Sequence, residues 1–209
     1  ELDRLYFGDT GGNVWRVDML PGLGGNSGSV SFKNNPQLTK IAELGGVGGD
    51  GDNRKFFYEP DTAMRLENGK PVMTISIGSG YRTHPLDIGD NDRFYVLVDE
   101  DYVFDPPPAN FTPTKDTDLM NVTALRSSGN SILDVSGYKG WYYPLSLRGE
   151  KVLATSLTFL DKVIFTTFAQ ATADGSPSII GPCEPLVTTS RAYVLDLLTG
   201  QPVANLDRE

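Results

Sequence analysis

The sequence predicts an all-β domain of the propeller type, and three observations support this prediction. Gly and Pro contribute 23 and 14 of the 209 residues and are spread along the chain, so helical periodicity is hard to find. Short runs of β-branched and aromatic residues alternate with turn residues, which is typical of strands. One pattern, an apolar strand followed by an aspartate and a turn, occurs three times. Because propellers repeat small antiparallel sheets, we expect several such sheets along the chain.

The first half of the chain is expected to form strands joined by tight turns. Gly11 and Gly12 permit the positive φ angles of a hairpin turn, so the strands on either side of them are expected to pair. Glu67-Asn68-Gly69-Lys70 marks a second turn, and Asp99-Glu100-Asp101 forms an acidic corner. The strands predicted in this half are 5–7, 14–17, 40–42, 56–58, 62–65, 72–77 and 93–98.

Residues 105–139 interrupt the strand pattern, and we interpret them as an insertion or long loop within one partial propeller domain that spans 1–209. Asp105-Pro106-Pro107-Pro108 begins a stiff, extended segment. Residues 116–122 are expected to form one short helical turn. Further strands are predicted at 141–145, 151–159, 162–168 and 191–195, with a tight link at Asp161-Lys162 and a long loop over 170–190.

The recurring pattern indicates how the strands are grouped. Its three copies are Val14–Asp18, Tyr95–Asp99 and Ala192–Asp196. We interpret each copy as the third strand of a four-stranded blade, with the aspartate capping the turn that follows. The chain then holds about three blades, whereas a propeller typically closes with about four to eight. We therefore expect an incomplete ring whose outer blades lack partners within this chain.

Charge and composition argue against several classes of function. The chain has 18 basic and 27 acidic residues, a net charge of −9, and such a surface repels phosphate backbones and anionic lipid heads. Nucleic acid is therefore not an expected partner. No apolar run approaches the roughly 18 residues of a membrane-spanning helix, and no basic, apolar leader opens the sequence.

The cysteine count limits covalent and metal chemistry. Cys183 is the only cysteine, so no disulfide forms within the chain and no site built on several cysteines is possible. Two interpretations stay open for Cys183: a small buried residue, or one half of a bridge to another polypeptide segment.

A family resemblance rests on segments that match in order along residues 3–203. The segment Tyr6–Asp18 is similar to the quinoprotein-type propeller repeat, and in more detail it resembles the form of that repeat in the PilY family of type IV pilus biogenesis factors and tip adhesins. The other matching segments are Ile77–Leu86, Asn91–Tyr95, Asp118–Thr123, Gly140–Tyr142, Gly149–Val152 and Val163–Thr167.

The resemblance implies part of the C-terminal, quinoprotein-like β-propeller of an extracellular protein at the bacterial surface or pilus tip. Members of the family work with minor pilins to initiate the pilus, and many bind calcium in a loop that tunes pilus extension against retraction. The expected partners are therefore the rest of the parent chain, minor pilins, and a host or abiotic surface. The expected function is pilus assembly and adhesion rather than catalysis.

The runner-up interpretation is a quinoprotein-like oxidoreductase propeller domain, because the same repeat type occurs in quinone-dependent alcohol dehydrogenases. Those enzymes require a cofactor cavity, and many carry adjacent cysteines, which this chain lacks. No quinone is therefore expected. His84 is the only histidine, and its position between Thr83 and Pro85 in a turn favours a structural role over catalysis.

The calcium expectation concerns Asp3. In the family, the strand that matches Arg4–Gly8 follows a loop of the form Asp-x-Asp-x-Asp-Gly-x-x-Asp, whose alternating oxygens suit calcium. The final carboxylate of that loop aligns with Asp3, and its other ligands are expected upstream of Glu1. Two other acidic stretches, Asp50–Asn53 and Asp87–Asp92, are incomplete as calcium loops and are interpreted as ordinary turns.

Asp9 and Asn13 are interpreted as hairpin residues. Trp15, Trp141, Tyr142 and Tyr143 lie in predicted strands, so they are expected to pack between blades rather than to form a ligand-stacking platform.

Overall fold

The computed structural model describes residues 4–19, 36–46, 52–123, 137–170 and 188–203. Within these ranges the strands form three sheets, none of which closes on itself, so the prediction of an all-β fold with several open sheets is confirmed. The 3-10 turn η1 (Asp116–Asp118) lies inside the stretch predicted to form a short helical turn.

The strands group in chain order. The first sheet contains β1 (Arg4–Gly8), β2 (Asn13–Asp18), β3 (Gln37–Glu43) and the short β7 (Thr114–Lys115). The second contains β4 (Asp61–Glu67), β5 (Lys70–Gly78), β6 (Arg93–Asp99), β9 (Gly140–Pro144) and the short β8 (Met120–Asn121). The third contains β10 (Lys151–Val152), β11 (Leu157–Phe159), β12 (Lys162–Ala169) and β13 (Thr189–Asp196).

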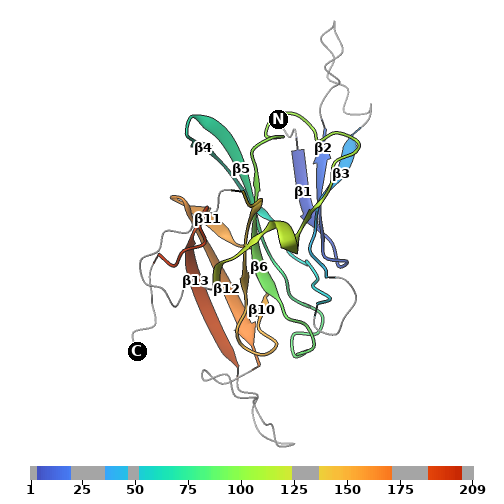
Figure 1. Ribbon diagram of the computed structural model, residues 1–209. Coiled ribbons are helices and arrows are strands. Elements are labelled where there is room, and N and C mark those ends of the chain that lie inside the picture. The colour runs from blue at the N-terminus through green and yellow to red at the C-terminus, as the bar shows by residue number, and fades with distance from the viewer. Residues whose placement is uncertain (1–3, 20–35, 47–51, 124–136, 171–187, 204–209) are drawn as a thin grey trace, which may run out of the picture.

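The second sheet lies between the other two (Figure 1), and β6 shows why. Alternate side chains of a strand point to opposite faces of its sheet. Tyr95 and Leu97 belong to the cluster shared with the first sheet, while Phe94 and Val96 belong to the cluster shared with the third. Because all four are buried apolar residues, this strand requires a sheet on each side.

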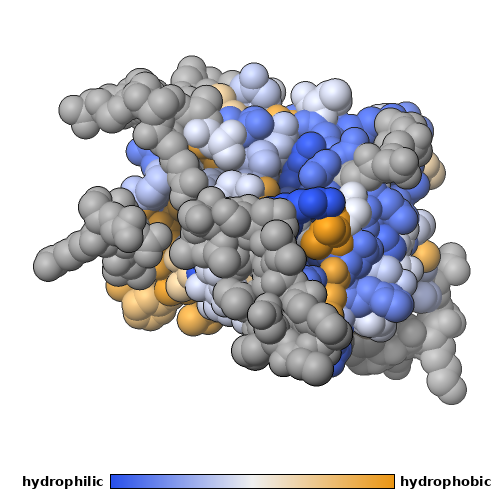
Figure 2. All heavy atoms as spheres, turned by 90° about the horizontal axis from the view of Figure 1, so that it is seen from below, coloured by the Kyte–Doolittle hydropathy of each residue, from blue (hydrophilic) through white to orange (hydrophobic). Residues whose placement is uncertain are grey.

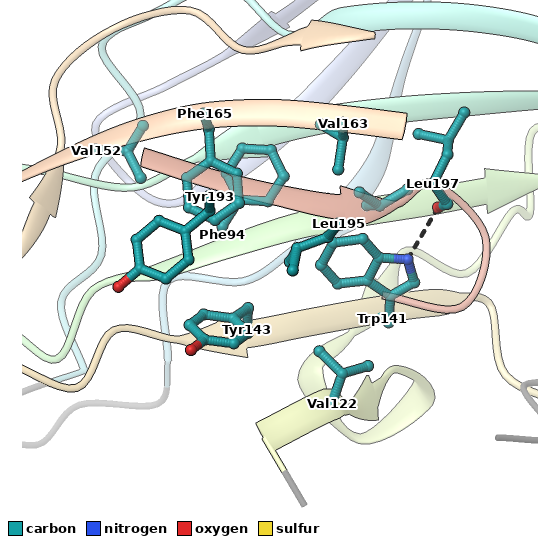
Figure 3. Close-up of a cluster of buried hydrophobic side chains, with 11 residues drawn as sticks. Phe94, Val122, Trp141, Tyr143, Val152, Val163, Phe165, Tyr193, Leu195 and Leu197 are labelled. Carbon is teal, nitrogen blue, oxygen red and sulfur yellow. Dashed lines mark hydrogen bonds between the residues drawn. The ribbon is translucent and has the colours of Figure 1, made fainter. Parts of the chain in front are cut away.

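The cluster between the second and third sheets is largely aromatic (Figure 3). Phe94 stacks on Phe165 with 3.8 Å between ring centroids, and Phe165 stacks on Tyr193 at 4.8 Å. The Trp141 ring is fully buried, and its Nε1 donates a hydrogen bond to the Leu197 carbonyl at 3.0 Å. Burial of these large rings is the main source of stability for this pair of sheets.

Two hairpin turns have the positive φ angles that two-residue turns favour. Asn68 and Gly69 join β4 to β5 with φ of 50° and 79°, as the sequence predicts. Leu160 and Asp161 join β11 to β12 with φ of 48° and 59°, so this link lies one residue earlier than predicted. The hairpin predicted between β1 and β2 is also confirmed.

Two predicted strands differ in the structure. Residues 151–159 do not form one strand, because β10 and β11 pair with β12 in two different registers. Val152 lies opposite Thr167 and Leu157 opposite Ile164, so five steps along one strand face three along β12 and the residues between bulge outward. Residues 56–58 are not a strand either. The Phe56 side chain packs into the cluster between the first and second sheets, with 2% of its surface exposed.

The aspartates of the recurring pattern have two different roles. Asp99 accepts a hydrogen bond from the Tyr102 amide at 2.8 Å, and Asp196 accepts from the Thr199 amide at 2.8 Å, so both cap turns as predicted. Asp18 does not, because it is buried and its carboxylate binds arginine side chains. The strand that precedes it, β2, is the second of its sheet rather than the third.

Candidate functional site

The acidic corner after β6 is held in place by a buried arginine of the first sheet. Arg16 is fully buried and donates to the Tyr102 and Asp105 carbonyls, each at 2.8 Å. It also pairs with Asp99 at 3.2 Å and with Asp18 at 2.7 Å. Because these are charge-assisted bonds to a guanidinium with fixed geometry, they fix the backbone of this corner against the first sheet.

A second arginine strengthens the same attachment. Arg4 pairs with the Asp18 carboxylate at 2.9 Å and donates to the Val103 carbonyl at 2.8 Å. Two guanidinium groups of neighbouring strands thus share one buried carboxylate and bind the loop that follows the corner. The local sequence explains this arrangement, because Arg16 and Asp18 are two residues apart and point to the same face of β2.

Above this attachment, a cleft of about 550 Å³ opens between the first and second sheets. Its apolar floor consists of Ile41, Ile75 and Leu97, one residue each from β3, β5 and β6. The remaining wall and rim residues include Asp99, Glu100, Asp101, Tyr102, Pro107, Pro108, Phe111, Tyr138 and Lys139. A cleft of this volume is of the size that binds small molecules or a short peptide segment.

The cleft combines aromatic walls with negative charge. Tyr102 and Phe111 contact edge to face at 5.6 Å between centroids, so the two rings are fixed relative to each other. The Lys139 ammonium lies 5.9 Å from the Phe111 ring. Glu100 and Asp101 are exposed at the rim. The chemistry of the cleft therefore suits a ligand with an apolar body and a positive group.

A partly buried ionic junction lies at the boundary between the same two sheets. The Asp116 carboxylate in η1 binds Arg93 at 2.8 Å and Arg54 at 3.3 Å. Arg54 is buried and also donates to the Leu44 carbonyl at 3.1 Å. Burial raises the pKa of the nearby Tyr95 hydroxyl far above its usual range. The junction holds the η1 turn over the boundary between the two sheets, and both of its arginines bind the Asp116 carboxylate.

The third sheet has its own buried polar cluster around Glu150. Its carboxylate accepts hydrogen bonds from Thr167 Oγ1 at 2.6 Å and from the Tyr193 hydroxyl at 2.9 Å. Burial, together with the Glu150 charge, raises the pKa of Tyr193. The neighbouring Lys151 donates to the Asp87 and Gly149 carbonyls, and burial lowers the pKa of its ammonium. These groups are occupied with structural contacts, which is the usual role of buried polar networks.

The residues singled out from the sequence are placed as follows. Asp3, Cys183 and the Asp50-Gly51 pair lie outside the described residues. The Asp9 carboxylate accepts from the Gly11 and Asn13 amides at 2.8 and 2.9 Å and from the Trp15 indole at 2.7 Å, so it is a hairpin residue as interpreted. His84 is exposed, with its ring 4.9 Å from that of Tyr81.

The acidic stretch 87–92 is engaged with lysines. The Asp90 carboxylate pairs with Lys55 at 3.1 Å, and Asp92 accepts a hydrogen bond from Ser79 Oγ at 2.6 Å. Burial raises the pKa of Asp92. No group of three or more His, Cys, Asp or Glu side chains is arranged to hold a metal ion anywhere in the part of the chain that the structure describes.

Three of the four aromatic residues pack between sheets, and Trp15 does not. Trp141 and Tyr143 belong to the cluster facing the third sheet, and Tyr142 packs against the cluster facing the first. Trp15 is half-buried on the opposite face of β2, stacked on Phe7 at 6.4 Å. Because β2 alternates, the ring falls on the side where the described part of the chain places no other sheet.

Sequence reasoning missed the buried ionic residues and the cleft. Arg16 lies two residues after Val14 in β2, so the alternation of the strand shows that the two side chains share a face but not that this face is buried. The cleft had no signal in the sequence, because Ile41, Leu97 and Phe111 come from distant segments.

Comparison with known proteins gives one informative result. No protein-family model and no curated protein matches the chain. The crystal structure of the Pseudomonas aeruginosa PilY1 C-terminal domain does match, with a TM-score of 0.60, 17% sequence identity and 95% of this chain covered. The chain has the fold of the PilY1 C-terminal domain. It spans 45% of the length of that solved chain.

The shared fold confirms the quinoprotein-like propeller architecture expected from the resemblance to the PilY family. At this level of identity the match to PilY1 establishes the fold. Among the described residues no helix is long and apolar enough to cross a membrane.

Proposed function

We propose that this chain is part of the propeller of an extracellular type IV pilus assembly factor that acts at the bacterial surface or pilus tip and contributes to surface attachment. The observation that carries the proposal is the match to the PilY1 C-terminal domain over 95% of the chain. The ordered sequence resemblance to the PilY family along residues 3–203 supports it independently. The expected partners are minor pilins, the rest of the parent chain, and a host or abiotic surface.

The role is one of binding and assembly rather than chemistry. Support comes from the polar clusters around Arg16, Asp116 and Glu150, whose members bind one another and the backbone. The cleft between the first and second sheets is the concave surface that offers apolar and charged groups together. We assign it the contact with a partner segment that carries apolar and basic side chains.

The pilus role is tested in the source bacterium by deleting the gene and restoring it. Surface pili are expected to fall in the deletion strain and to return when the wild-type gene is supplied. Unchanged piliation and twitching in the deletion strain would contradict the proposal. The runner-up, a quinone-dependent oxidoreductase, has a separate test, because the purified protein then shows the absorbance band of a bound quinone.

The cleft is tested by reversing its charge. Glu100→Lys and Asp101→Lys together are expected to reduce surface piliation severalfold, because they replace the negative rim that faces the basic partner. Glu59→Lys, an exposed acidic residue that does not line the cleft, is the matched control. Both proteins are expected to keep the wild-type melting temperature. Equal piliation in the two strains would exclude the cleft as the contact.

Calcium binding at Asp3 is a further proposal, and it rests on the alignment with the family's calcium loop. Calorimetry compares this chain with a polypeptide extended upstream by about a dozen residues, the length of a calcium loop. Tight binding by the longer polypeptide, lost on Asp3→Ala, is the expected result. No calcium binding by the longer polypeptide would remove the proposal.

A further inference from the structure

Two aromatic rings form a corner in the cleft between the first and second sheets. Tyr102 and Phe111 both line the cleft, and their ring planes meet at 86° with 5.6 Å between the centroids. Rings in this edge-to-face arrangement are perpendicular, so the faces of the two rings bound a concave space. Both side chains are half-buried, so part of each remains open to the cleft. We call the space between these two rings the aromatic corner.

The aromatic corner is held in place from the backbone. The Tyr102 carbonyl accepts a hydrogen bond from Arg16, and the Tyr102 amide donates to Asp99, each at 2.8 Å. The Phe111 amide donates to the Pro108 carbonyl at 2.9 Å, and the Phe111 ring packs against the cluster between the first and second sheets. A site fixed in this way loses little conformational freedom when a ligand enters.

Negative charge lies beside the aromatic corner. The faces of aromatic rings carry a negative quadrupole and attract cations. The exposed Glu100 and Asp101 line the same cleft and add full negative charges to that field. The floor beneath is apolar, with Ile41 and Leu97 among its residues. The combination of rings, carboxylates and an apolar floor suits a cation that is itself partly apolar.

The chain already places one of its own cations near this site. The Lys139 ammonium lies 5.9 Å from the Phe111 ring centroid, within the distance of a cation–π contact. The Lys139 backbone is fixed, because its amide donates to the Asp118 carbonyl and its carbonyl accepts from the Val98 amide, each at 2.9 Å. The side chain is exposed and can move without breaking either hydrogen bond. A cationic ligand therefore competes with Lys139 for the Phe111 ring.

The shape of the aromatic corner distinguishes between classes of cation. A planar guanidinium stacks on one ring face at a time, and an unmodified lysine ammonium is compact and strongly hydrated. A trimethylammonium group is rounded and weakly hydrated, so its methyl groups contact two perpendicular faces at once. Aromatic sites of proteins bind quaternary ammonium groups in this way.

We infer that the aromatic corner binds a methylated ammonium group of the partner segment, such as a trimethylated lysine side chain, and that Lys139 weakens this binding by competition. The inference rests on the proposed role of the cleft as a contact surface, and it specifies the chemistry of the group that the cleft recognises.

Calorimetry on the purified protein tests the inference with choline as the probe. The control ligand is the uncharged carbon isostere of choline, in which a tert-butyl group replaces the trimethylammonium. Choline is expected to bind about tenfold more tightly than the isostere, because only the cation gains from the rings and carboxylates. Equal affinity for the two ligands would overturn the inference, since the cleft would then recognise only apolar shape.

Two variants are expected to change the affinity for choline in opposite directions. Phe111→Leu should weaken binding about fivefold, and Lys139→Gln should tighten it about threefold. Phe104→Leu is the matched control, because Phe104 is an aromatic residue of the same loop that is 66% exposed and does not line the cleft. Melting temperatures of all three show whether they fold. Lys139→Gln changes an exposed side chain, so unchanged or weaker choline binding by this folded variant would contradict the competition.

The source of the ammonium group is tested with two further ligands. Phosphocholine carries the same cation next to a phosphate, which Glu100 and Asp101 repel, so an acetylated trimethyllysine amide is expected to bind more tightly. Tighter binding of phosphocholine would overturn the assignment to a polypeptide. These measurements use purified protein, so their failure leaves the pilus role intact. Failure of the pilus role is detected separately, as unchanged piliation in the deletion strain.

Discussion

The two tryptophans of this chain lie in opposite environments, and the difference decides what each contributes. Trp141 is fully buried among rings of the second and third sheets, and its indole nitrogen is bonded to a carbonyl. Trp15 is stacked on Phe7 on a face that is still partly exposed. Both residues lie in strands, so strand assignment alone does not separate them.

We expect Trp141→Ala to lower the free energy of unfolding of the 209-residue chain by about 3–5 kcal/mol, because it leaves a cavity and a carbonyl without its donor. Trp15→Ala is expected to cost about 1–2 kcal/mol, since a partly exposed ring leaves no closed cavity. Urea unfolding of both variants measures the difference. A cost for Trp15→Ala equal to or above that for Trp141→Ala would contradict this arrangement of the sheets.

The Asp9 carboxyl makes the free energy of unfolding depend on pH in the acid range. Burial alone raises the pKa of its carboxyl, but hydrogen bonds from the Trp15 indole, the Asn13 amide and side chain, and the Gly11 amide outweigh it and lower the pKa below 3.8. A carboxyl whose pKa is lower in the folded state adds stability above its unfolded pKa. That stability is lost as pH falls through the folded pKa.

The free energy of unfolding is therefore expected to fall as the pH drops below about 4, and Asp9→Asn is expected to make this fall shallower. Denaturant unfolding at a series of pH values measures the slope. Asp87→Asn, which removes a turn-capping carboxylate that accepts a hydrogen bond from the Gly89 amide at 3.0 Å, serves as the control. An identical acid slope in wild type and Asp9→Asn would show that the hydrogen bonds to Asp9 do not favour its charged form.

At the scale of elements, two turns contain a glycine for different reasons: one for its backbone conformation alone, the other also because a side chain would not fit. Gly69 has a φ of 79°, and nothing lies within 4 Å of the position its Cβ would take. Gly200 has a φ of 66°, but an added Cβ would lie 2.8 Å from Val122 Cγ1 and 3.0 Å from Trp141 Cδ2. Both turns favour glycine because of its positive φ angle. Only at Gly200 would a Cβ atom also collide with packed side chains.

Gly69→Ala is expected to cost about 1–2 kcal/mol of unfolding free energy from the left-handed backbone alone. Gly200→Ala is expected to cost about 1–3 kcal/mol more, because its Cβ presses on a packed core. Thermal or urea unfolding of the two variants gives the comparison. Equal costs would mean that the turn after β13 does not pack against Val122 and Trp141.

Sequence reasoning located elements well where the signal is local, and less well where it depends on distant partners. The hairpins at Gly12 and at Asn68-Gly69 contain residues with positive φ angles, and both hairpins were predicted. The break in 151–159 depends on the register against β12, and the inward turn of Phe56 depends on a core built from two sheets. Neither is visible in a single segment.

The same limit applies to the candidate site. A strand pattern shows that a side chain alternates, but not which face of the sheet has a neighbour, so the side taken by Trp15 was not predictable. The cleft brings together residues that are far apart along the chain, such as Ile41 and Phe111. The composition indicated only that the surface of the chain is acidic.

At the scale of the whole molecule, the three sheets are stacked in chain order, and charge dominates much of the exterior. The view from below is largely hydrophilic, with hydrophobic residues gathered in separate groups (Figure 2). A net charge of −9 keeps such a molecule soluble and disfavours anionic partners. Leu5, Phe7 and Leu38 of the first sheet are exposed in spite of this charge.

The central claim is that these sheets are three consecutive blades of a larger propeller with the PilY1 C-terminal fold. The crystal structure of the complete protein tests it most directly. The account predicts that the second sheet lies between the first and third, that Phe94 stacks on Phe165, and that Arg16 binds the corner at Asp99. A ring closed by residues 4–203 alone, or another sheet inserted between the first and second, would contradict it.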